Sequence, residues 1–374
     1  MTSAPAGTPS STPAGMTAVD FQHSANLAPL LQQLGVSLLV STYQAGKVFT
    51  IGTAAGALQI RFYHFEQAMG LARTPTGLAI GTRRQVWSLP AAPDLASRLQ
   101  PPGQYDSCFL ARHAHFTGSI LGHELAWCKG ELWVVNTLFS CLCVLPPDFS
   151  FAPRWRPPFI SGLAAEDRCH LNGLAVDDDR PRYVTALGEC DTAAGWRANK
   201  ASGGCLIDVP SGEVVLRGLC MPHSPRIHQG QLWLLNSGKG QLSRCDPAAG
   251  RLDAVAQLPG YARGMDCFGR HAFVGLSRIR ETAVFGGLPI AAQRPELLCG
   301  VAVVDMAAGQ TVATLQFSSG VEEIFDVKVL PGCRSPMLSG PFPEEDRGEP
   351  LWLVPSGDAS AASSPATRGG VGVE

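Results

Sequence analysis

Two segments of the chain follow one pattern. In the first, His-Glu-Leu-Ala-Trp at residues 123–127 precedes Gly-Glu-Leu-Trp-Val-Val-Asn-Thr at 130–137. In the second, His-Ser-Pro-Arg-Ile at 223–227 precedes Gly-Gln-Leu-Trp-Leu-Leu-Asn-Ser at 230–237. In both, the second apolar run opens nine positions after the histidine. Repetition at a fixed period indicates that the chain is built from copies of one structural unit.

The same frame fits three more segments, which begin at Met69, Asn172 and Arg263 and have spacings of nine, ten and nine positions. A sixth first half, residues 325–329, lacks a second half, and a second half at residues 38–42 lacks a first half. These two leftovers complete one unit if the two ends of the repeat region meet. The six units then start about 51 residues apart.

A turn pattern, Asp-x-x-x-Gly, recurs between apolar runs at residues 208–212, 246–250 and 305–309. Asp binds local amides at the start of a turn, and Gly supplies positive φ. Each unit is therefore predicted to hold four strands, with the outer two joined at this turn. Six such units predict an all-β fold, a six-bladed β-propeller whose ring is closed by strands from both termini. The alternative, a two-sheet sandwich, does not explain the constant frame.

The segments outside the repeat set the expected domain boundaries. Residues 1–18 are rich in Ala, Pro, Ser, Thr and Gly and lack the basic start and apolar core of a secretory signal. We therefore expect a disordered leader over residues 1–24 and a single propeller domain over 25–335. Residues 336–374 are expected to form a C-terminal extension that is mostly a disordered tail. A seventh blade that uses residues 351–354 stays open as an alternative.

Composition excludes several classes of protein. The net charge is −2, which excludes a strongly basic nucleic-acid binder. No stretch approaches 18 consecutive apolar residues, so no membrane-spanning helix is expected. The twelve cysteines are scattered and no export signal is present. We therefore expect a cytoplasmic protein whose cysteines are mostly reduced and buried.

The start of each inner strand is where a propeller can place chemistry, because these positions surround its central funnel. By the repeat they are Met69, His123, Asn172, His223, Arg263 and Phe325. Four of the six are polar, which a purely structural ring does not require. His170 lies two residues before Asn172 and is predicted to point to the same side of the strand. Glu124 follows His123 directly and is predicted to face the other way.

The histidines leave several chemistries open. His123, His170 and His223 are candidate catalytic residues that act as general acids or bases. They are equally candidate ligands of a divalent metal ion such as zinc, iron or copper. A calcium site built on Asn172 and Glu189 is a further alternative.

Arginines and one long loop supply candidate ligand-binding residues. An arginine at a funnel holds a carboxylate, sulfate or phosphate through two parallel hydrogen bonds. The loop at residues 188–204 is long for a propeller hairpin, and such loops often carry binding contacts. The candidates are Asn172, Trp196, Arg197, Arg226, Arg263 and Arg280.

Seven stretches carry a family resemblance. They are residues 38–47, 123–127, 132–137, 170–175, 221–226, 232–238 and 275–281. Over about residues 25–335 the chain resembles a family of conserved hypothetical bacterial proteins. Its architecture is more distantly similar to six-bladed lactonase and strictosidine-synthase-like propellers, and this likeness implies a divalent metal or a ligand pocket at the funnel. The acidic metal ligands of those proteins are missing here in an obvious frame.

These patterns predict a small-molecule-binding β-propeller with a central funnel lined by His, Asn and Arg. The expected ligand is small and polar or anionic, a divalent metal ion is a possible cofactor, and metal-assisted hydrolysis or oxidative modification is a possible reaction. The alternative is a non-catalytic interaction scaffold that holds a protein partner with its rim and the 188–204 loop. Neither interpretation involves nucleic acid or a membrane.

Overall fold

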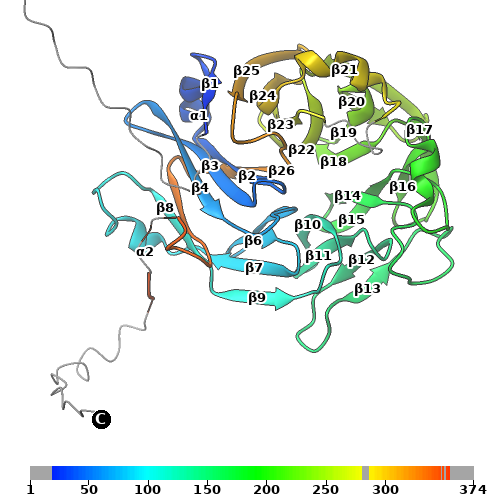
Figure 1. Ribbon diagram of the computed structural model, residues 1–374, viewed down its shortest axis with the longest axis horizontal. Coiled ribbons are helices and arrows are strands. Elements are labelled where there is room, and N and C mark those ends of the chain that lie inside the picture. Colours follow the sequence, from blue (N-terminus) through cyan, green and yellow to red (C-terminus); the bar gives the residue numbers. More distant parts are fainter. Residues whose placement is uncertain (1–18, 280–285, 347, 349–350, 354–374) are drawn as a thin grey trace, which may run out of the picture.

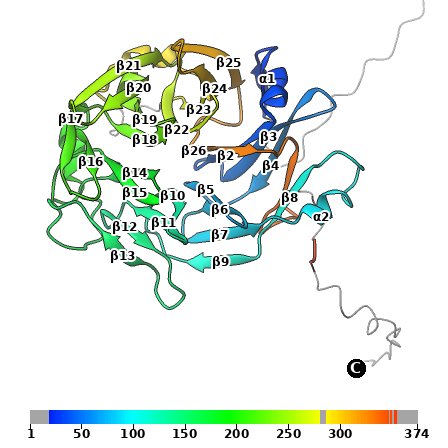
Figure 2. The same cartoon turned by 180° about the vertical axis from the view of Figure 1, so that it is seen from behind.

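Six four-stranded antiparallel sheets form a ring in the computed structural model (Figures 1 and 2). The structure describes residues 19–279, 286–346, 348 and 351–353. Numbered along the chain, the blades are β26-β2-β3-β4, β5-β6-β7-β9, β10 to β13, β14 to β17, β18 to β21, and β22 to β25. The predicted six-bladed propeller is thus confirmed.

The inner strands line the axis and the second strands pack outside them. The inner strands are β26 (Asp326–Pro331), β5 (Leu71–Thr74), β10 (Gly122–Cys128), β14 (Leu171–Asp177), β18 (Pro222–His228) and β22 (Tyr261–Phe268). The second strands are β2 (Val36–Thr42), β6 (Gly77–Gly81), β11 (Glu131–Asn136), β15 (Arg180–Ala186), β19 (Gln231–Asn236) and β23 (His271–Ser277). Five of the six repeat units found in the sequence are therefore inner hairpins, and the sixth is the pair of distant strands β26 and β2.

The outer half of each blade is a second hairpin. The third strands are β3 (Lys47–Ala54), β7 (Gln85–Pro90), β12 (Cys141–Val144), β16 (Gly204–Asp208), β20 (Gln241–Asp246) and β24 (Cys299–Asp305). The outer strands are β4 (Ala57–His64), β9 (His113–Phe116), β13 (Ala152–Trp155), β17 (Val214–Leu219), β21 (Arg251–Gln257) and β25 (Gln310–Phe317). The helical segments are α1 (Leu27–Leu34), α2 (Pro93–Ala96), η1 (Gly195–Asn199), η2 (Ser237–Lys239) and η3 (Pro289–Glu296).

The Asp-x-x-x-Gly segments form the predicted outer turns in blades 4, 5 and 6. In blade 4, the Asp208 carboxylate accepts the Ser211 N–H at 3.1 Å, and Gly212 has φ 75°. The Asp246 and Asp305 carboxylates accept amides three residues on in the same way. Local hydrogen bonding by Asp thus positions the turn, as the pattern indicated.

Closure of the ring joins distant parts of the chain. Inner strand β26 pairs with β2 along its length, from Val36 opposite Pro331 to Ser41 opposite Asp326. The two leftover half-units therefore do complete one blade. Apolar residues of α1, blade 1 and blade 6 share one buried cluster, which includes Leu31, Phe49 and Phe317.

Both expected domain boundaries need correction. Strand β1 (Phe21–His23) pairs with β25 and adds a fifth strand to blade 6, so the ordered chain begins before residue 25. Strand β27 (Pro336–Ser339) pairs in parallel with β8 (Ser107–Leu110), so the ordered domain continues past residue 335. Residues 351–353 form no strand, and Val354 lies outside the described residues.

All twelve cysteines are free thiols, as expected for a chain that builds its own core. Ten are buried. No helix within the described part of the chain has the length and apolar character needed to cross a membrane.

A β-bulge interrupts four of the six inner strands near their start. In β10 the pairing with β11 shifts by one residue between Gly122 and Leu125, and β14, β18 and β22 shift at equivalent places. A bulge inserts an extra residue and redirects side chains. Glu124 consequently enters the channel, and the prediction that it faces away is wrong because it assumed unbroken alternation.

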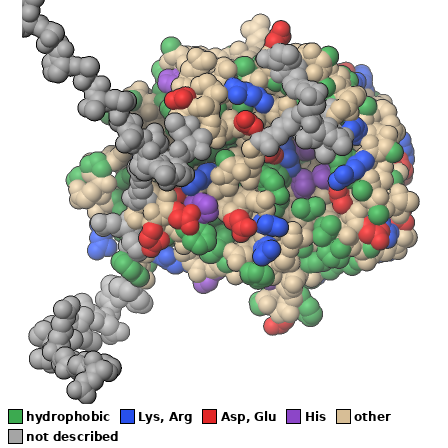
Figure 3. All heavy atoms as spheres, viewed as in Figure 1, with side chains coloured by type: hydrophobic (Ala, Val, Ile, Leu, Met, Phe, Trp, Pro, Cys, Tyr) green, Lys and Arg blue, Asp and Glu red, His purple; other side chains and the backbone are tan. Residues whose placement is uncertain are grey.

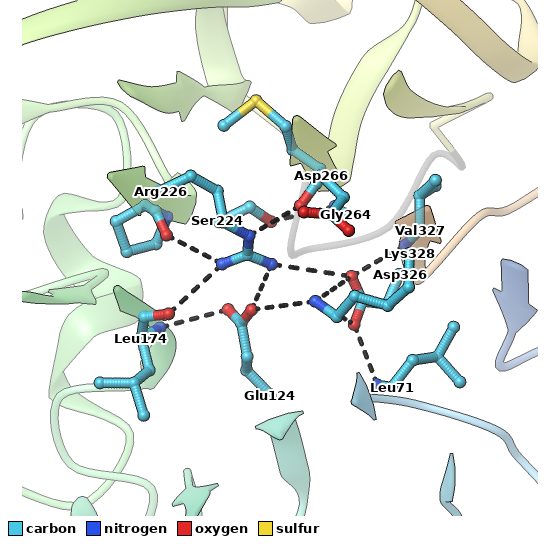
Figure 4. Close-up of polar contacts among 12 residues, drawn as sticks. Leu71, Glu124, Leu174, Ser224, Arg226, Gly264, Asp266, Asp326, Val327 and Lys328 are labelled. Atoms are coloured by element: carbon cyan, nitrogen blue, oxygen red, sulfur yellow. Dashed lines mark hydrogen bonds and ion pairs between the residues drawn. The ribbon is translucent and has the colours of Figure 1, made fainter. Parts of the chain in front are cut away.

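Buried charges fill the channel where the inner strands meet (Figure 4). The Lys328 ammonium lies 3.4 Å from Glu124 Oε1 and 3.2 Å from Asp326 Oδ2. The Arg226 guanidinium contacts Glu124 and lies 4.0 Å from Asp326 Oδ1. Burial disfavours the charged guanidinium, but the carboxylates of Glu124, Asp326 and Asp266 outweigh it and raise the Arg226 pKa. We call these four residues, Glu124, Arg226, Asp326 and Lys328, the axial charge cluster.

The axial charge cluster also binds backbone groups of other blades. The bonds are Leu71 N–H to Asp326 at 2.9 Å, Leu174 N–H to Glu124 at 3.2 Å, and Arg226 Nε–H to Met265 O at 2.8 Å. These contacts connect blades 1 and 2, blades 3 and 4, and blades 5 and 6. Together with the ion pairs across the axis, they link all six inner strands.

Replacing Arg226 with Met is expected to lower the free energy of unfolding by about 3–5 kcal/mol, because the buried carboxylates lose their strongest partner. Urea denaturation measures the change. Arg251→Met is the control, since the Arg251–Asp253 pair is solvent-exposed and contributes less than about 1 kcal/mol. Equal losses in the two variants would contradict a stabilising role for the cluster.

Candidate functional site

A pocket of about 430 Å³ opens at the end of the axis where the inner strands begin. Its wall is made by Tyr43, Gln44, Met69, Leu121, His123, Asp167, His170, Leu187, Trp196, Arg197, Met221, His223, Tyr261, Arg263, Ser277, Arg278, Glu323 and Phe325. Figure 3 shows histidine side chains near the middle of one face of the ring, with basic and apolar side chains around them. The axial charge cluster lies deeper, because its residues come later along the same inner strands.

His123 and His223 are held by one local device that recurs in blades 3 and 5. Leu121 and Met221 have positive φ values of 54° and 48°, which are uncommon for bulky residues. In this conformation their carbonyl oxygens lie 3.0 and 2.9 Å from Nδ1 of the histidine two residues on. A carbonyl can only accept, so both rings carry their hydrogen on Nδ1.

Burial makes both of these histidines poor bases. It is the largest cause that lowers the pKa of His123 and His223 well below 6.5, and His170 and Arg263 add to it for His123. Arg263 is the main neighbouring charge that lowers the pKa of His223. The two imidazoles are therefore neutral at pH 7.

His170 belongs to a different arrangement. Its Nδ1 lies 2.9 and 3.0 Å from the two carboxylate oxygens of Asp167, and the Trp196 indole N–H donates to the same carboxylate at 3.0 Å. The His170 ring lies 4.5 Å from the Trp196 ring and 4.7 Å from the His123 ring, measured between centroids. Asp167 thus fixes both the imidazole and the aromatic wall beside it.

Arg263 supplies positive charge to the opposite wall. Its guanidinium carbon lies 3.5 Å from the centroid of the Phe325 ring, and Nη1 lies 3.3 Å from Glu323 Oε1. Burial lowers the pKa of Arg263, and Glu323 offsets this only in part. Among the described residues of the wall, three arginines face two carboxylates, which gives these residues a formal charge of +1 when the histidines are neutral.

The structure brings most of the predicted site residues together. His123, His170, His223, Arg263, Trp196 and Arg197 all line the pocket. Asn172 and Arg226, which were also predicted to bind a ligand, do not line the pocket. Asn172 donates to Pro222 O of the next blade and accepts from Thr185, while Arg226 belongs to the axial charge cluster. Arg280 lies outside the described residues.

A metal site does not emerge from these residues. Within the described ranges, no three His, Cys, Asp or Glu side chains are grouped so that they could hold a metal ion. The metal role predicted for His123, His170 and His223 therefore finds no support in their geometry. The calcium alternative has no support in the geometry either, because the Glu189 carboxylate forms an ion pair with Arg217, with Oε2 2.7 Å from Nε.

Among the pocket residues that sequence reasoning missed are Tyr261, Glu323 and Asp167. Tyr261 and Glu323 lie two positions before the repeat positions Arg263 and Phe325, and Asp167 lies three positions before His170. Alternation along a strand would have predicted that Tyr261 points to the same side as Arg263. Asp167 had no such signal, since a loop outside the repeat positions it.

The comparison with protein-family models decides the family. A model described as a domain of unknown function (DUF4915) matches residues 25–338. The chain belongs to this family. No curated protein matches the chain.

Several solved structures resemble the DUF4915 chain in architecture. A chain from a nidogen/laminin complex is 12% identical with a TM-score of 0.47, and the match covers 79% of this chain and 98% of that one. Virginiamycin B lyase from Staphylococcus aureus is 10% identical with a TM-score of 0.40, and the match covers 76% and 77%. A catalytically inactive form of that lyase with quinupristin gives 11% and 0.38, with 64% and 73% covered.

The buried histidines predict a pH-dependent stability. Their pKa values lie below the roughly 6.5 of an unfolded chain, so below about pH 7 the unfolded chain takes up protons that the folded protein does not. The free energy of unfolding is expected to decrease as the pH is lowered, by up to about 1.4 kcal/mol per pH unit for each histidine. Urea denaturation between pH 7.5 and 5 measures this slope.

The slope should flatten in a His123→Gln, His223→Gln double variant. His113→Gln, a change on the exposed strand β9, is the control and should keep the wild-type slope. An unchanged slope in the double variant would show that other groups cause the acid sensitivity.

Proposed function

We propose that the protein binds a small organic anion in its central pocket. The observation that carries this proposal is the part-buried Arg263 guanidinium, which lies against Phe325 and, within the described part of the chain, forms an ion pair with Glu323 alone. A buried cation that is incompletely neutralised gains from an added negative charge, because few water molecules compete for it.

The rest of the wall suits an organic anion. Trp196, Phe325 and Tyr43 offer apolar ring faces, and the Tyr43 and Phe325 rings lie 6.1 Å apart. Pockets that are apolar with a few placed polar groups are typical of small-molecule sites. A larger groove of about 870 Å³ between blades 4 and 5 is also charged. Three of its four arginines, however, already face acidic partners: Arg182 lies 3.1 Å from Asp208, and Arg244 and Arg251 lie 3.6 and 3.2 Å from Asp253.

A panel of carboxylates tests the proposal, with benzoate, cyclohexanecarboxylate and glucuronate as first members and titration calorimetry as the measurement. Arg263→Gln is expected to weaken binding at least about tenfold, since a charge-assisted hydrogen bond is lost. Arg251→Gln, on the outer strand β21, should bind as the wild type does. The proposal fails if no acid binds, or if Arg263→Gln binds equally well.

Proton-transfer catalysis is a second candidate function, and the Asp167–His170 pair favours it. A carboxylate that accepts Nδ1–H fixes the tautomer and leaves Nε2 able to take a proton from a ligand. Such a base supports several reactions on an acid held by Arg263.

Deuterium exchange tests this second function. Acids that bind are incubated in D₂O and their C–H groups are followed by NMR. We expect exchange with the wild type, its loss in His170→Gln and its retention in His113→Gln. If no bound acid exchanges faster with protein than without it, the pocket is a binding site alone.

A further inference from the structure

The hydrogen positions on two histidines restrict what the pocket accepts. For His223, Nδ1 lies 2.9 Å from Met221 O and 3.0 Å from Ser237 Oγ. The carbonyl requires a hydrogen on Nδ1. Nε2, on the opposite edge of the ring, is then a lone pair.

His123 reaches the same state by a parallel set of contacts. Nδ1 lies 3.0 Å from Leu121 O and 2.8 Å from Thr137 Oγ. Thr137 donates its only hydroxyl hydrogen to Leu171 O at 2.5 Å, so it must accept from the ring. Both histidines line the pocket with their one N–H bonded within the protein, so Nε2 is the ring nitrogen left for a ligand.

Within the described part of the chain, no hydrogen bond reaches Nε2 of His123 or His223. His223 is 5% exposed and lines the pocket, and its Nε2 is not among the buried atoms without a partner, so the lone pair is open to the pocket. A ligand that supplies a donor forms a hydrogen bond with this acceptor in surroundings with little water.

We propose that the ligand is a hydroxylated organic acid whose hydroxyl groups donate to Nε2 of His123 and His223. This inference rests on the proposed binding of an organic anion. The carboxylate goes to Arg263, because a neutral Nε2 lone pair repels carboxylate oxygens. A protonated amine is also a donor, but it adds positive charge beside Arg263 in a pocket that is already positive. A neutral hydroxyl has no such penalty.

The aromatic walls add a preference for a ring. Trp196 is 3% exposed and packs against His170 with the ring planes tilted by 42°, so this part of the apolar wall is fixed before a ligand arrives. Both a polyhydroxylated saturated ring and a hydroxylated aromatic ring combine a flat face with hydroxyl donors. The shared chemistry is a ring acid that carries hydroxyl groups.

Matched ligands test the donor requirement by titration calorimetry. Quinate is compared with cyclohexanecarboxylate for the saturated ring. For the aromatic ring, 3,4-dihydroxybenzoate is compared with benzoate and with 3,4-dimethoxybenzoate, which keeps the oxygen acceptors and loses the donors. We expect a hydroxylated acid to bind at least about tenfold more tightly than its parent and its methoxy form. The ring type whose hydroxylated form binds more tightly identifies whether the ligand has a saturated or an aromatic ring.

Variants assign that gain to the histidines. The ratio of parent Kd to hydroxylated Kd should fall toward one in His123→Phe and His223→Phe, which keep a ring and lose the acceptor. His228→Phe is the control, because His228 lies at the far end of the same strand β18 and its Nε2 bonds Gly269 O. It should keep the wild-type ratio.

The outcomes separate this inference from the proposed function. If parent and hydroxylated acids bind equally, the donor requirement is wrong and anion binding stands. If methoxy and hydroxy forms bind equally, the donor requirement is also wrong. If an amino acid such as glycine binds more tightly than the same acid without its amino group, while hydroxylated acids bind no more tightly than their parents, the preference for hydroxyl over ammonium is overturned. If no acid binds at all, the proposed function and this inference fail together.

A measurement on the wild type guards against variants that do not fold. Two-bond ¹⁵N–¹H correlation spectra report which ring nitrogen carries the hydrogen. We expect the Nδ1–H form for both His123 and His223 at pH 7. An Nε2–H form for either ring would overturn the inference without any substitution.

Discussion

The pairing of buried charges at the axis is the contact on which the ring depends. Six inner strands converge there, and each brings polar backbone groups into a space with little water. Glu124, Arg226, Asp326 and Lys328 satisfy one another and also bind backbone groups of neighbouring blades. Apolar packing between blades is non-directional, whereas these contacts require particular strands at particular heights. The cluster thus fixes the register of the inner strands.

The position of the pocket depends on the axial charge cluster, because the pocket residues lie on the same inner strands, nearer to the start of each strand. Bulges in β10, β14, β18 and β22 allow neighbouring residues such as His123 and Glu124 to serve different layers. The lower layer is the axial charge cluster, whose charged side chains pair with one another. The upper layer holds the imidazoles of His123 and His223, apolar side chains and the Arg263 guanidinium, so the proposed ligand site lies in this layer.

Much of the fold could be predicted from the sequence, because each blade repeats the same hairpin in the same frame. The frame placed His123, His223 and Arg263 correctly, since equivalent positions in a repeat occupy equivalent positions around the axis. It failed for Asn172, whose amide is used between blades, and for Glu124, because a bulge has no mark in the residue pattern. Asp167 and Trp196 come from loops between blades, where no repeat constrains position. The ends of the domain were misplaced because β1 and β27 lie outside the repeat.

The way the ring closes also sets the order in which the protein becomes complete during synthesis. Residues 323 to 331 provide Glu323, Phe325 and the whole of inner strand β26, although their partners in β2 emerge almost 300 residues earlier. A nascent chain must therefore keep β2, β3 and β4 without an inner strand until nearly the entire propeller has been made. Contacts between such distant segments form slowly. Chains that stop short have neither the axial charges of Asp326 and Lys328 nor the wall against which Arg263 lies, so the proposed ligand site is complete only in finished molecules.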